Sequence, residues 1–268
     1  MEAAVTMPGA NSVTSNQETI HKDLEEVVRK YARTTFLRPI ADHTREAFAE
    51  AEEFVRKFYG NTGTAPSAVI LDSGCGTGES TIHIARRFPN IPVIGIDKSC
   101  ARLNKAGNPS QTAGEEIPAN AFWIRAELLD FWRLALDRVK SGEWTIPHHA
   151  VYYPNPWPKQ SEATRRFHMH PIFPTLLALG NTIELRTNWE IYAREFAEAA
   201  RIVLTAQIPD QGRNDEGAER CRNMQACFYT RGETKITCEP FEPVAPETAF
   251  ERKYKEAGQT LWKVEIKQ

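Results

Sequence analysis

Three glycines and an acidic residue have the types and spacing that a nucleoside-binding site needs. Gly74, Gly76 and Gly78 stand at alternate positions directly after a short apolar run, within the segment Leu71–Glu79. Glycines so placed permit a tight turn and a close approach of the backbone to a ligand. A helix that begins there adds free N–H groups. Asp97 ends the next apolar run, where its carboxylate can accept hydrogen bonds from both hydroxyls of a ribose.

The sequence around this loop favours one class of nucleoside cofactor. A dinucleotide site typically carries Gly-x-Gly-x-x-Gly and holds a pyrophosphate. Here the loop reads Gly-x-Gly-x-Gly and is followed by Glu79, a carboxylate in the first helical turn that disfavours a pyrophosphate. The same carboxylate tolerates the cationic sulfonium of S-adenosylmethionine, which we therefore expect as the cofactor. A dinucleotide and a purely structural glycine turn are the alternatives.

The ends of the next two apolar runs extend this predicted cofactor site. Glu127 follows the third run, where it can accept a hydrogen bond from the amino group of adenine. The alternative is a solvated glutamate at the start of a helix. The residues that we expect to bind the cofactor here are Asp72, Gly74, Gly76, Gly78, Asp97, Lys98, Ala126 and Glu127.

A second group of residues, after the fourth apolar run, could bind an anionic substrate. Its cationic side chains are those of Lys159, Arg165 and Arg166, followed by His168 and His170. Such side chains bind RNA phosphates or form ordinary surface ion pairs. No cluster of cysteines or aspartates accompanies the two histidines, so we expect no metal site. Trp157 either stacks on a base or fills the interior of its loop.

Short apolar runs that alternate with helical segments predict the elements that position these residues. The runs cover residues 68–71, 93–96, 121–124, 150–153 and 182–185, and helical periodicity covers residues 80–88 and 189–203. Strands that alternate with helices imply crossover connections and a mostly parallel sheet. Leu261–Ile266 alternates strictly and predicts a last strand beside that sheet. We expect a Rossmann-like α/β fold with a mostly parallel seven-stranded sheet and helices on both faces.

The flanking segments divide the chain into three parts. Residues 1–16 are small and polar and predict a disordered leader. Residues 17–64 contain two amphipathic helices, one with Leu24, Val27, Val28 and Tyr31 on its apolar face and one with Phe48, Ala51, Phe54, Val55 and Phe58. These helices either cap the main domain, residues 65–268, or take part in substrate binding. Residues 207–232 are polar and Arg-rich, which predicts a long loop or an irregular insert.

Composition excludes several classes of protein. With 268 residues and 41% hydrophobic side chains, the chain can bury a core without disulfide or metal staples. Its five cysteines form no CxxC pair, and a reducing compartment is expected. No secretory signal or membrane-spanning run is present, so we expect a soluble, cytoplasmic protein. The net charge of −2 gives no global basic field, and any contact with nucleic acid must be local.

Four separated motifs resemble the tRNA (guanine-N7)-methyltransferase family. Besides the glycine loop, the segment Tyr153–Lys159 and its downstream arginine pair are similar to the family's Pro-Asp-Pro-Trp-x-Lys loop. Thr187–Tyr192 resembles its Thr-Asp element, and Thr248–Glu251 its Thr-x-x-Glu element. The motifs follow in the right order between residues 65 and 266. The resemblance implies the class I methyltransferase fold, S-adenosylmethionine as methyl donor, and guanine N7 of tRNA as acceptor.

The resemblance also assigns the remaining site residues. Asn155 and Asn188 stand where the family has aspartates that face the cofactor and the target base, so both are expected to be catalytic, with Asn155 also binding the cofactor. A carboxylate only accepts hydrogen bonds, whereas an amide also donates them. These two departures therefore predict a shift in the substrate. The expected substrate-binding residues are Trp157, Lys159, Arg165, Arg166, Asn188, Thr248 and Glu251, the alternative for Thr248 being a helix cap.

Three functional hypotheses remain at this point. The leading one is methyl transfer to a nucleobase, with guanine in tRNA as the first candidate. The second keeps the cofactor and replaces the acceptor by a small heteroaromatic metabolite, which is favoured by the isoelectric point near 6.4 and by the segment 160–164, which is less basic than the family's loop. The third is a non-catalytic RNA-binding or scaffold subunit. The intact glycines and Asp97 argue against that third hypothesis.

Overall fold

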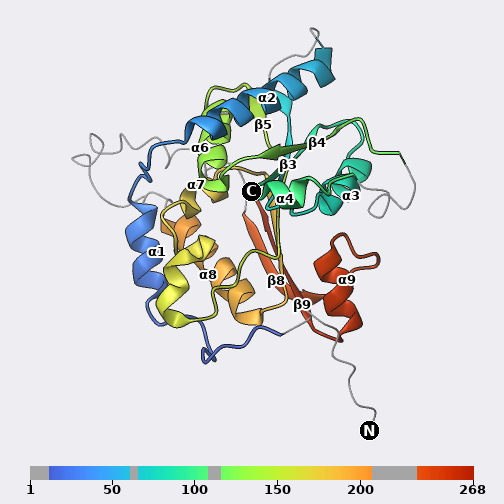
Figure 1. Ribbon diagram of the computed structural model, residues 1–268. Coiled ribbons are helices and arrows are strands. Elements are labelled where there is room, and N and C mark those ends of the chain that lie inside the picture. The colour runs from blue at the N-terminus through green and yellow to red at the C-terminus, as the bar shows by residue number, and fades with distance from the viewer. Residues whose placement is uncertain (1–11, 61–65, 108–115, 207–233) are drawn as a thin grey trace, which may run out of the picture.

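A seven-stranded sheet runs through the middle of the protein (Figure 1). The computed structural model describes residues 12–60, 66–107, 116–206 and 234–268. The strands, in spatial order, are β4 (Ala121–Arg125), β3 (Val93–Asp97), β2 (Ile70–Ser73), β6 (His148–Tyr152), β7 (Thr182–Thr187), β9 (Leu261–Lys267) and β8 (Lys235–Phe241). Strand β9 is antiparallel to both of its neighbours, and the other pairs are parallel. The predicted mostly parallel seven-stranded sheet is confirmed.

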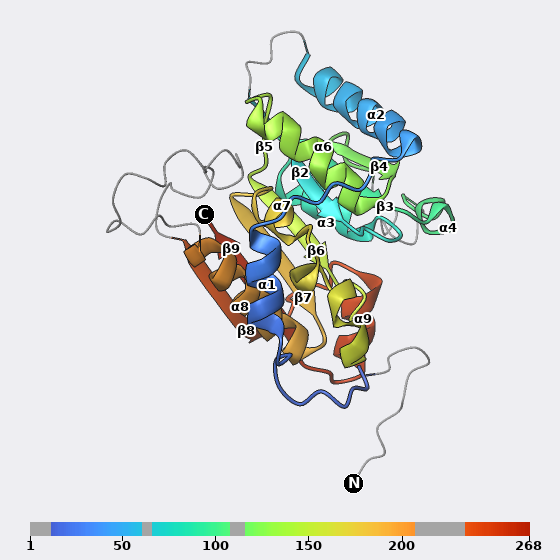
Figure 2. The same ribbon diagram turned by 90° about the vertical axis from the view of Figure 1, so that its left-hand side faces the viewer.

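Helices cover both faces of this sheet. In Figure 1, α3 and α9 lie on one side of the strands and α1 and α8 on the other, and Figure 2 shows α2 lying along α6. The helices are α1 (Leu24–Ala32), α2 (Asp42–Tyr59), α3 (Glu79–Arg87), α4 (Cys100–Leu103), α6 (Leu128–Lys140), α7 (Phe173–Leu177), α8 (Glu190–Ala206) and α9 (Ala249–Glu256), with short 3-10 turns η2 (Gln160–Arg165) and η3 (Phe167–Met169). Two short strands, β1 (Ser67–Ala68) and β5 (Trp144–Thr145), pair with each other apart from the main sheet.

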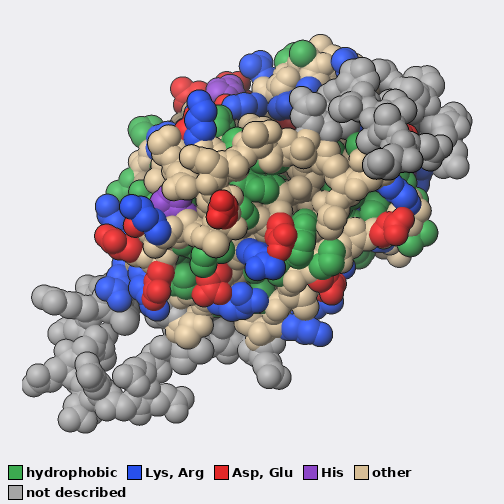
Figure 3. All heavy atoms as spheres, turned by 90° about the horizontal axis from the view of Figure 1, so that it is seen from below, with side chains coloured by type: hydrophobic (Ala, Val, Ile, Leu, Met, Phe, Trp, Pro, Cys, Tyr) green, Lys and Arg blue, Asp and Glu red, His purple; other side chains and the backbone are tan. Residues whose placement is uncertain are grey.

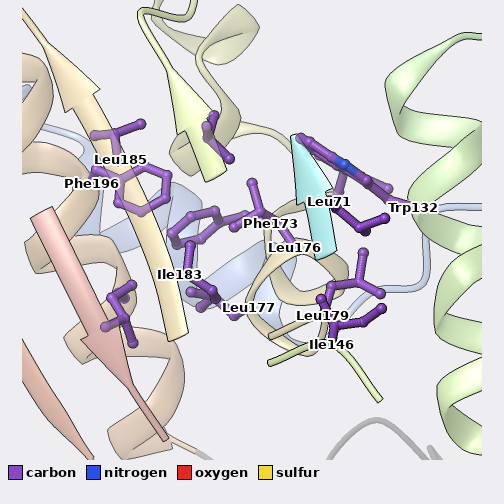
Figure 4. Packing of buried hydrophobic residues seen from close by; sticks show 14 of the residues in the cluster. Leu71, Trp132, Ile146, Phe173, Leu176, Leu177, Leu179, Ile183, Leu185 and Phe196 are labelled. Carbon is purple, nitrogen blue, oxygen red and sulfur yellow. The ribbon is translucent and has the colours of Figure 1, made fainter. Parts of the chain in front are cut away.

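One continuous apolar core joins the sheet to the helices on the α8 side. Figure 4 shows Phe173 of α7 between Leu71 of β2 and Ile183 of β7, with Phe196 of α8 close to Leu185. These side chains are fully buried or nearly so. Burying such a side chain contributes roughly 1.5–3 kcal/mol. This packing connects β2 and β7 through α7.

The strand order places the functional residues at one edge of the sheet. From β2 the chain continues outward to β3 and β4 on one side, and then returns to β6 on the other. In open α/β sheets, ligands bind at such a reversal, outside the carboxyl ends of the strands. The glycine loop after β2, Asp97 at the end of β3 and the segment after β6 all lie at that edge.

Strand β8 was not among the individual runs, although its residues alternate between apolar and polar from Ile236 to Glu239. The hypothetical insert at residues 207–232 lies outside the described residues, as do residues 1–11 of the expected disordered leader. The end of that leader is ordered, because the Ser15 hydroxyl donates a hydrogen bond to the carbonyl of Pro158 at 2.7 Å. Among the described helices, none combines the length and apolar character that a bilayer crossing requires.

Candidate active site

The loop between β2 and α3 is a tight cradle of backbone. Gly74, Gly76 and Gly78 all have positive φ, at 81°, 60° and 81°. The amide of Gly74 donates to the carbonyl of Ile96 at 2.8 Å, which ties the loop to β3. A Cβ on Gly78 would lie 2.3 Å from Nε1 of Trp123, so no side chain fits there. The loop requires glycine for its conformation at all three positions and for space at the last.

Asp97 connects this loop to the end of β3. Its Oδ2 accepts a hydrogen bond from the amide of Gly76 at 3.0 Å, and its Oδ1 accepts from the amide of Ser99 and from Arg102. The carboxylate is almost fully buried, whereas the neighbouring Lys98 is exposed. Each carboxylate oxygen has more than one lone pair. Asp97 can therefore hold the glycine loop and still accept hydrogen bonds from a ribose.

Asp72 acts from beneath the loop. It is 1% exposed, and its Oδ2 accepts hydrogen bonds from the hydroxyls of Ser80 at 2.6 Å and Thr81 at 2.7 Å. Burial raises the pKa of Asp72 to about 6, against the lowering effect of these two hydrogen bonds. The carboxyl therefore clamps the first turn of α3 to β2, and its role in cofactor binding remains a prediction.

Glu79 does not present an unpaired charge to a ligand. It is 6% exposed, and its Oε1 lies 2.7 Å from Nη2 of Arg252 on α9. Because this arginine compensates the carboxylate, the charge-based argument against a pyrophosphate is weaker than the sequence suggested. The ion pair instead fixes α9 beside the cofactor loop.

The end of β4 supplies the third side of the site. Ala126 is buried, and its amide donates to the carbonyl of Asp97 at 3.2 Å. Glu127 is half-buried at the N-terminus of α6, and its carboxylate does not cap that helix. The amide of Glu127 donates to the hydroxyl of Thr44 on α2 at 3.3 Å. This bond ties the backbone of Glu127 to α2. The carboxylate of Glu127 can accept a hydrogen bond from an adenine amino group.

The segment Tyr153–Lys159, hereafter the acceptor loop, follows β6. Two of its residues have positive φ without being glycine, Tyr153 at 50° and Trp157 at 45°. Asn155 lies between them with an exposed side chain, and Lys159 is exposed as well. The guanidinium of Arg165 lies 3.3 Å from the ring centroid of Trp157 and also pairs with Glu162. The loop and the neighbouring Arg165 of η2 therefore present an amide, a ring and two cations at the surface.

Arg166 occupies a different place from its neighbour. Its side chain is 0% exposed, and its Nη1 lies 2.6 Å from Glu195 of α8. Its Nε and Nη2 donate to the carbonyl of Trp157 at 3.2 and 2.9 Å. The guanidinium therefore faces the interior of the protein in this structure, and the predicted contact of Arg166 with the substrate remains a prediction. His168 is equally buried and bonds to the same glutamate.

Asn188 follows the end of β7. The residue is half-buried, and its Nδ2 donates to Oε1 of Gln259 at 3.0 Å. The amide is thus oriented by a second amide, at the same sheet edge as the acceptor loop. Its expected catalytic and substrate-binding roles are compatible with this position and remain predictions.

The Thr-x-x-Glu element has mainly an internal role. The hydroxyl of Thr248 accepts a hydrogen bond from the amide of Glu251 at 3.0 Å and caps α9, as its alternative interpretation predicted. Glu251 is 0% exposed, and its carboxylate accepts from Arg186 and from the amide of Glu247, both at 2.7 Å. The carboxylate of Glu251 docks α9 on the sheet in this structure, and its predicted contact with the substrate remains a prediction.

Comparison with known proteins identifies the family. The family model Methyltransf_4, described as "Putative methyltransferase", matches residues 66–264. That span contains the glycine loop, Asp97, the acceptor loop and both asparagines. The chain belongs to this methyltransferase family.

Several named proteins are similar to this methyltransferase. The tRNA (guanine-N(7)-)-methyltransferase of Neisseria meningitidis serogroup C is 27% identical over 201 residues, which are 74% of this chain and 71% of that protein. The enzyme of the same name from Mycolicibacterium gilvum is 30% identical over 138 residues, 48% of this chain and 49% of that protein. The solved 16S rRNA methyltransferase KamB is 16% identical with a TM-score of 0.42, covering 92% of this chain and 96% of that one.

The residues of the cofactor loop fit S-adenosylmethionine, which is the methyl donor of this methyltransferase. The three glycines at positive φ leave the loop without side chains toward a ligand, and the carboxylates of Asp97 and Glu127 offer acceptors for a ribose and an adenine. When bound, the donor supplies an electrophilic methyl group on a sulfonium. Asp97 and Glu127 are the residues that would hold it, at the sheet edge from which the acceptor loop also emerges.

Sequence reasoning missed the residues that hold the acceptor side of the methyltransferase together. Glu195 lies on the same helical face as Tyr192, and a charge on that apolar stripe was a readable signal for a buried partner. Arg186, near the end of the buried strand β7, was a second such signal. It pairs with Glu184, Glu247 and Glu251 and lies over the ring of Tyr152.

Surface charge is mixed rather than uniformly basic. On the face shown in Figure 3, Lys and Arg side chains are interspersed with Asp and Glu. Within the described ranges, no group of three or more His, Cys, Asp or Glu side chains gathers in the way that a metal ion needs. On that face no continuous basic surface is seen.

Proposed function

We propose that this methyltransferase transfers the methyl group of S-adenosylmethionine to N7 of guanine in tRNA. The observation that supports this most is the acceptor loop, in which an exposed Asn155 precedes the stacked pair Trp157–Arg165 beside the cofactor cradle. The relatives named tRNA (guanine-N(7)-)-methyltransferase support the same acceptor over most of the chain. Cytoplasmic localisation follows as part of this proposal.

The chemistry demands positioning more than proton transfer. N7 of guanine carries a free lone pair, so no proton has to leave before attack on the methyl carbon. Holding the two reactants in line can supply much of the rate enhancement. An amide at position 155 or 188 therefore permits the reaction, while it alters which edge of a base is recognised. Lys159 and Arg165 would contact phosphates, and Trp157 would stack against a base.

The direct test is to incubate the protein with labelled S-adenosylmethionine and total tRNA, and to identify the labelled nucleoside after digestion. We expect 7-methylguanosine. The absence of label in tRNA, together with label in a parallel metabolite extract, would replace this proposal by the second candidate, a small heteroaromatic acceptor. The net charge of −2 and the mixed surface favour that candidate.

The two asparagines provide a second test. The double variant Asn155→Asp, Asn188→Asp should bind guanine's donor edge better. We expect kcat/KM on tRNA to rise about tenfold, because one mismatched polar group that is buried in the complex costs about 1–3 kcal/mol. Asn181→Asp, at an exposed position away from the site, is the matched control. If the double variant gains nothing on guanine, the amides do not set the substrate.

A further inference from the structure

A segment outside the family match contacts the back of the acceptor loop. Residues 12–23 precede α1, and Figures 1 and 2 show this segment running along one end of the molecule before it enters that helix. The hydroxyl of Ser15 donates to the carbonyl of Pro158 at 2.7 Å, and in turn accepts from the amide of Gln17 at 3.0 Å. The matched region begins only at residue 66.

Gln17 inserts its side chain into the protein behind the loop. The residue is 6% exposed, and its Nε2 donates to Oε1 of Glu195 at 2.6 Å. Its Oε1 accepts from Nη2 of Arg166 at 3.0 Å. The amide of His21 donates to the same glutamate at 2.7 Å. Gln17 thus satisfies both members of a buried ion pair at once.

That ion pair holds the acceptor loop through its backbone. Arg166 donates twice to the carbonyl of Trp157 and once to Glu195, and the side chains of both charged residues are 0% exposed. The charges cancel, and His168 donates its Nε2 hydrogen to the glutamate because a carboxylate only accepts. Burial raises the pKa of Glu195, but His168 and Arg166 outweigh it and lower that pKa to about 2. The carboxylate therefore stays ionised.

The conformation of the acceptor loop depends on contacts from outside the loop. Pro154, Pro156 and Pro158 have no N–H group, so the loop has few donors with which to form internal hydrogen bonds. Tyr153 and Trp157 both have positive φ, which costs a non-glycine residue about 1–3 kcal/mol and persists only where surrounding contacts impose it. The carbonyls of Trp157 and Pro158 receive those contacts, the first from Arg166 and the second from Ser15.

We propose that Ser15 and Gln17 are positioning residues of the methyl-transfer site, which act by fixing the acceptor loop from the N-terminal segment. They touch neither cofactor nor acceptor. Ser15 forms a hydrogen bond with the loop directly. Gln17 forms one with the guanidinium of Arg166, which in turn bonds to the loop. The catalytic part of this inference rests on the proposed methyl transfer, whereas its structural part concerns the rigidity of the loop alone.

The experiment compares Ser15→Ala, Gln17→Ala and the control Thr19→Ala in the full chain. Thr19 is exposed, and its hydroxyl reaches only the neighbouring carbonyl of Ile20. Hydrogen exchange of the peptide 153–167 should accelerate about fivefold in Ser15→Ala and more in Gln17→Ala, with no change in the control. The dissociation constant of S-adenosylhomocysteine should stay within about twofold, because the cofactor cradle is not touched.

Steady-state kinetics should show the same division. We expect kcat on tRNA to fall about 10- to 100-fold in Gln17→Ala and less in Ser15→Ala, since small displacements of positioned groups have effects of this size. Ser15→Thr, which keeps the hydroxyl, should restore the rate. Unchanged exchange of peptide 153–167 in folded Ser15→Ala would overturn the inference, even if Gln17→Ala failed to fold. A wild-type protein inactive on tRNA would refute the proposed function and leave the exchange experiment decisive for the loop.

Discussion

The two loops of the active site hold unusual backbone conformations in opposite ways. The cofactor loop has three residues with positive φ, and all of them are glycines. The acceptor loop has two residues with positive φ, Tyr153 and Trp157, and neither of them is a glycine. The first conformation is therefore available to its own sequence at little cost, whereas the second is imposed by contacts from distant segments.

This difference has a consequence for where mutations act. The cofactor loop depends on residues within it and on the adjacent Asp97. The acceptor loop depends on Arg166, which in turn depends on Gln17 of the N-terminal segment and on Glu195 of α8. A change far from the chemistry should therefore disturb the acceptor side selectively.

Removing the charge of Glu195 should have the largest effect on stability. It tests whether the acceptor loop, unlike the cofactor loop, depends on residues outside it. Glu195→Gln leaves the buried guanidinium of Arg166 without a counter-charge, and we expect the free energy of unfolding at pH 7 to fall by about 3 kcal/mol. The same change should loosen the acceptor loop in hydrogen exchange. Denaturant unfolding measures the first effect. A loss below about 0.5 kcal/mol would show that the ion pair contributes little.

The pH dependence of this loss has a defined sign. The pKa of Glu195 lies at about 2 in the folded protein and near its ordinary value in the unfolded chain. Its contribution is therefore present above the unfolded pKa and is lost as the pH falls toward 2. The difference in stability between wild type and Glu195→Gln should be constant from pH 7 to 5 and shrink below about pH 4. A difference that grows on acidification would contradict this assignment.

The same contrast explains what could be predicted from the sequence. Strands β2, β3, β4, β6, β7 and β9 and the cofactor loop were predictable, because apolar runs and glycine spacing are local signals. The burial of Arg166 was not, since a basic pair beside a surface loop has the same sequence pattern whether it faces solvent or Glu195. The partner lies 29 residues away, and only the packing of η3 on α8 brings them together.

Glu251 illustrates the same limit from the acidic side. Its motif suggested a substrate contact, and the structure instead pairs it with Arg186, 65 residues earlier in the chain. Thr248, by contrast, had a local alternative as a helix cap, and that alternative is confirmed. Local capping chemistry is readable from spacing, whereas the choice between a ligand and a buried ion pair depends on tertiary contacts.

Gly78→Ala sharpens the comparison from the cofactor side. The new alanine would have to adopt positive φ. Its Cβ would lie 2.3 Å from Trp123 and 2.9 Å from Ala106, so the loop must move. Strain and overpacking together cost about 3 kcal/mol, which corresponds to roughly 100-fold weaker binding of S-adenosylhomocysteine by calorimetry. Gly142→Ala is the matched control, because its φ is also positive at 74° and nothing lies within 4 Å of its Cβ. Equal cofactor affinity in the two variants would show that the cofactor site does not require glycine at position 78.

Arg165→Gln should have the smallest effect and separates the surface of the acceptor loop from its support. Arg165 is 55% exposed, stacks on Trp157 and pairs with Glu162 three residues away. Its loss should leave stability within about 0.5 kcal/mol, raise the KM for tRNA about threefold to tenfold and reduce the salt slope of binding by about 1. Arg201→Gln on α8 breaks a similar exposed pair with Glu198 and should change neither quantity. If both variants behave alike on tRNA, Arg165 is a solvated charge, and the acceptor loop owes its specificity to Asn155 and Trp157 rather than to its cations.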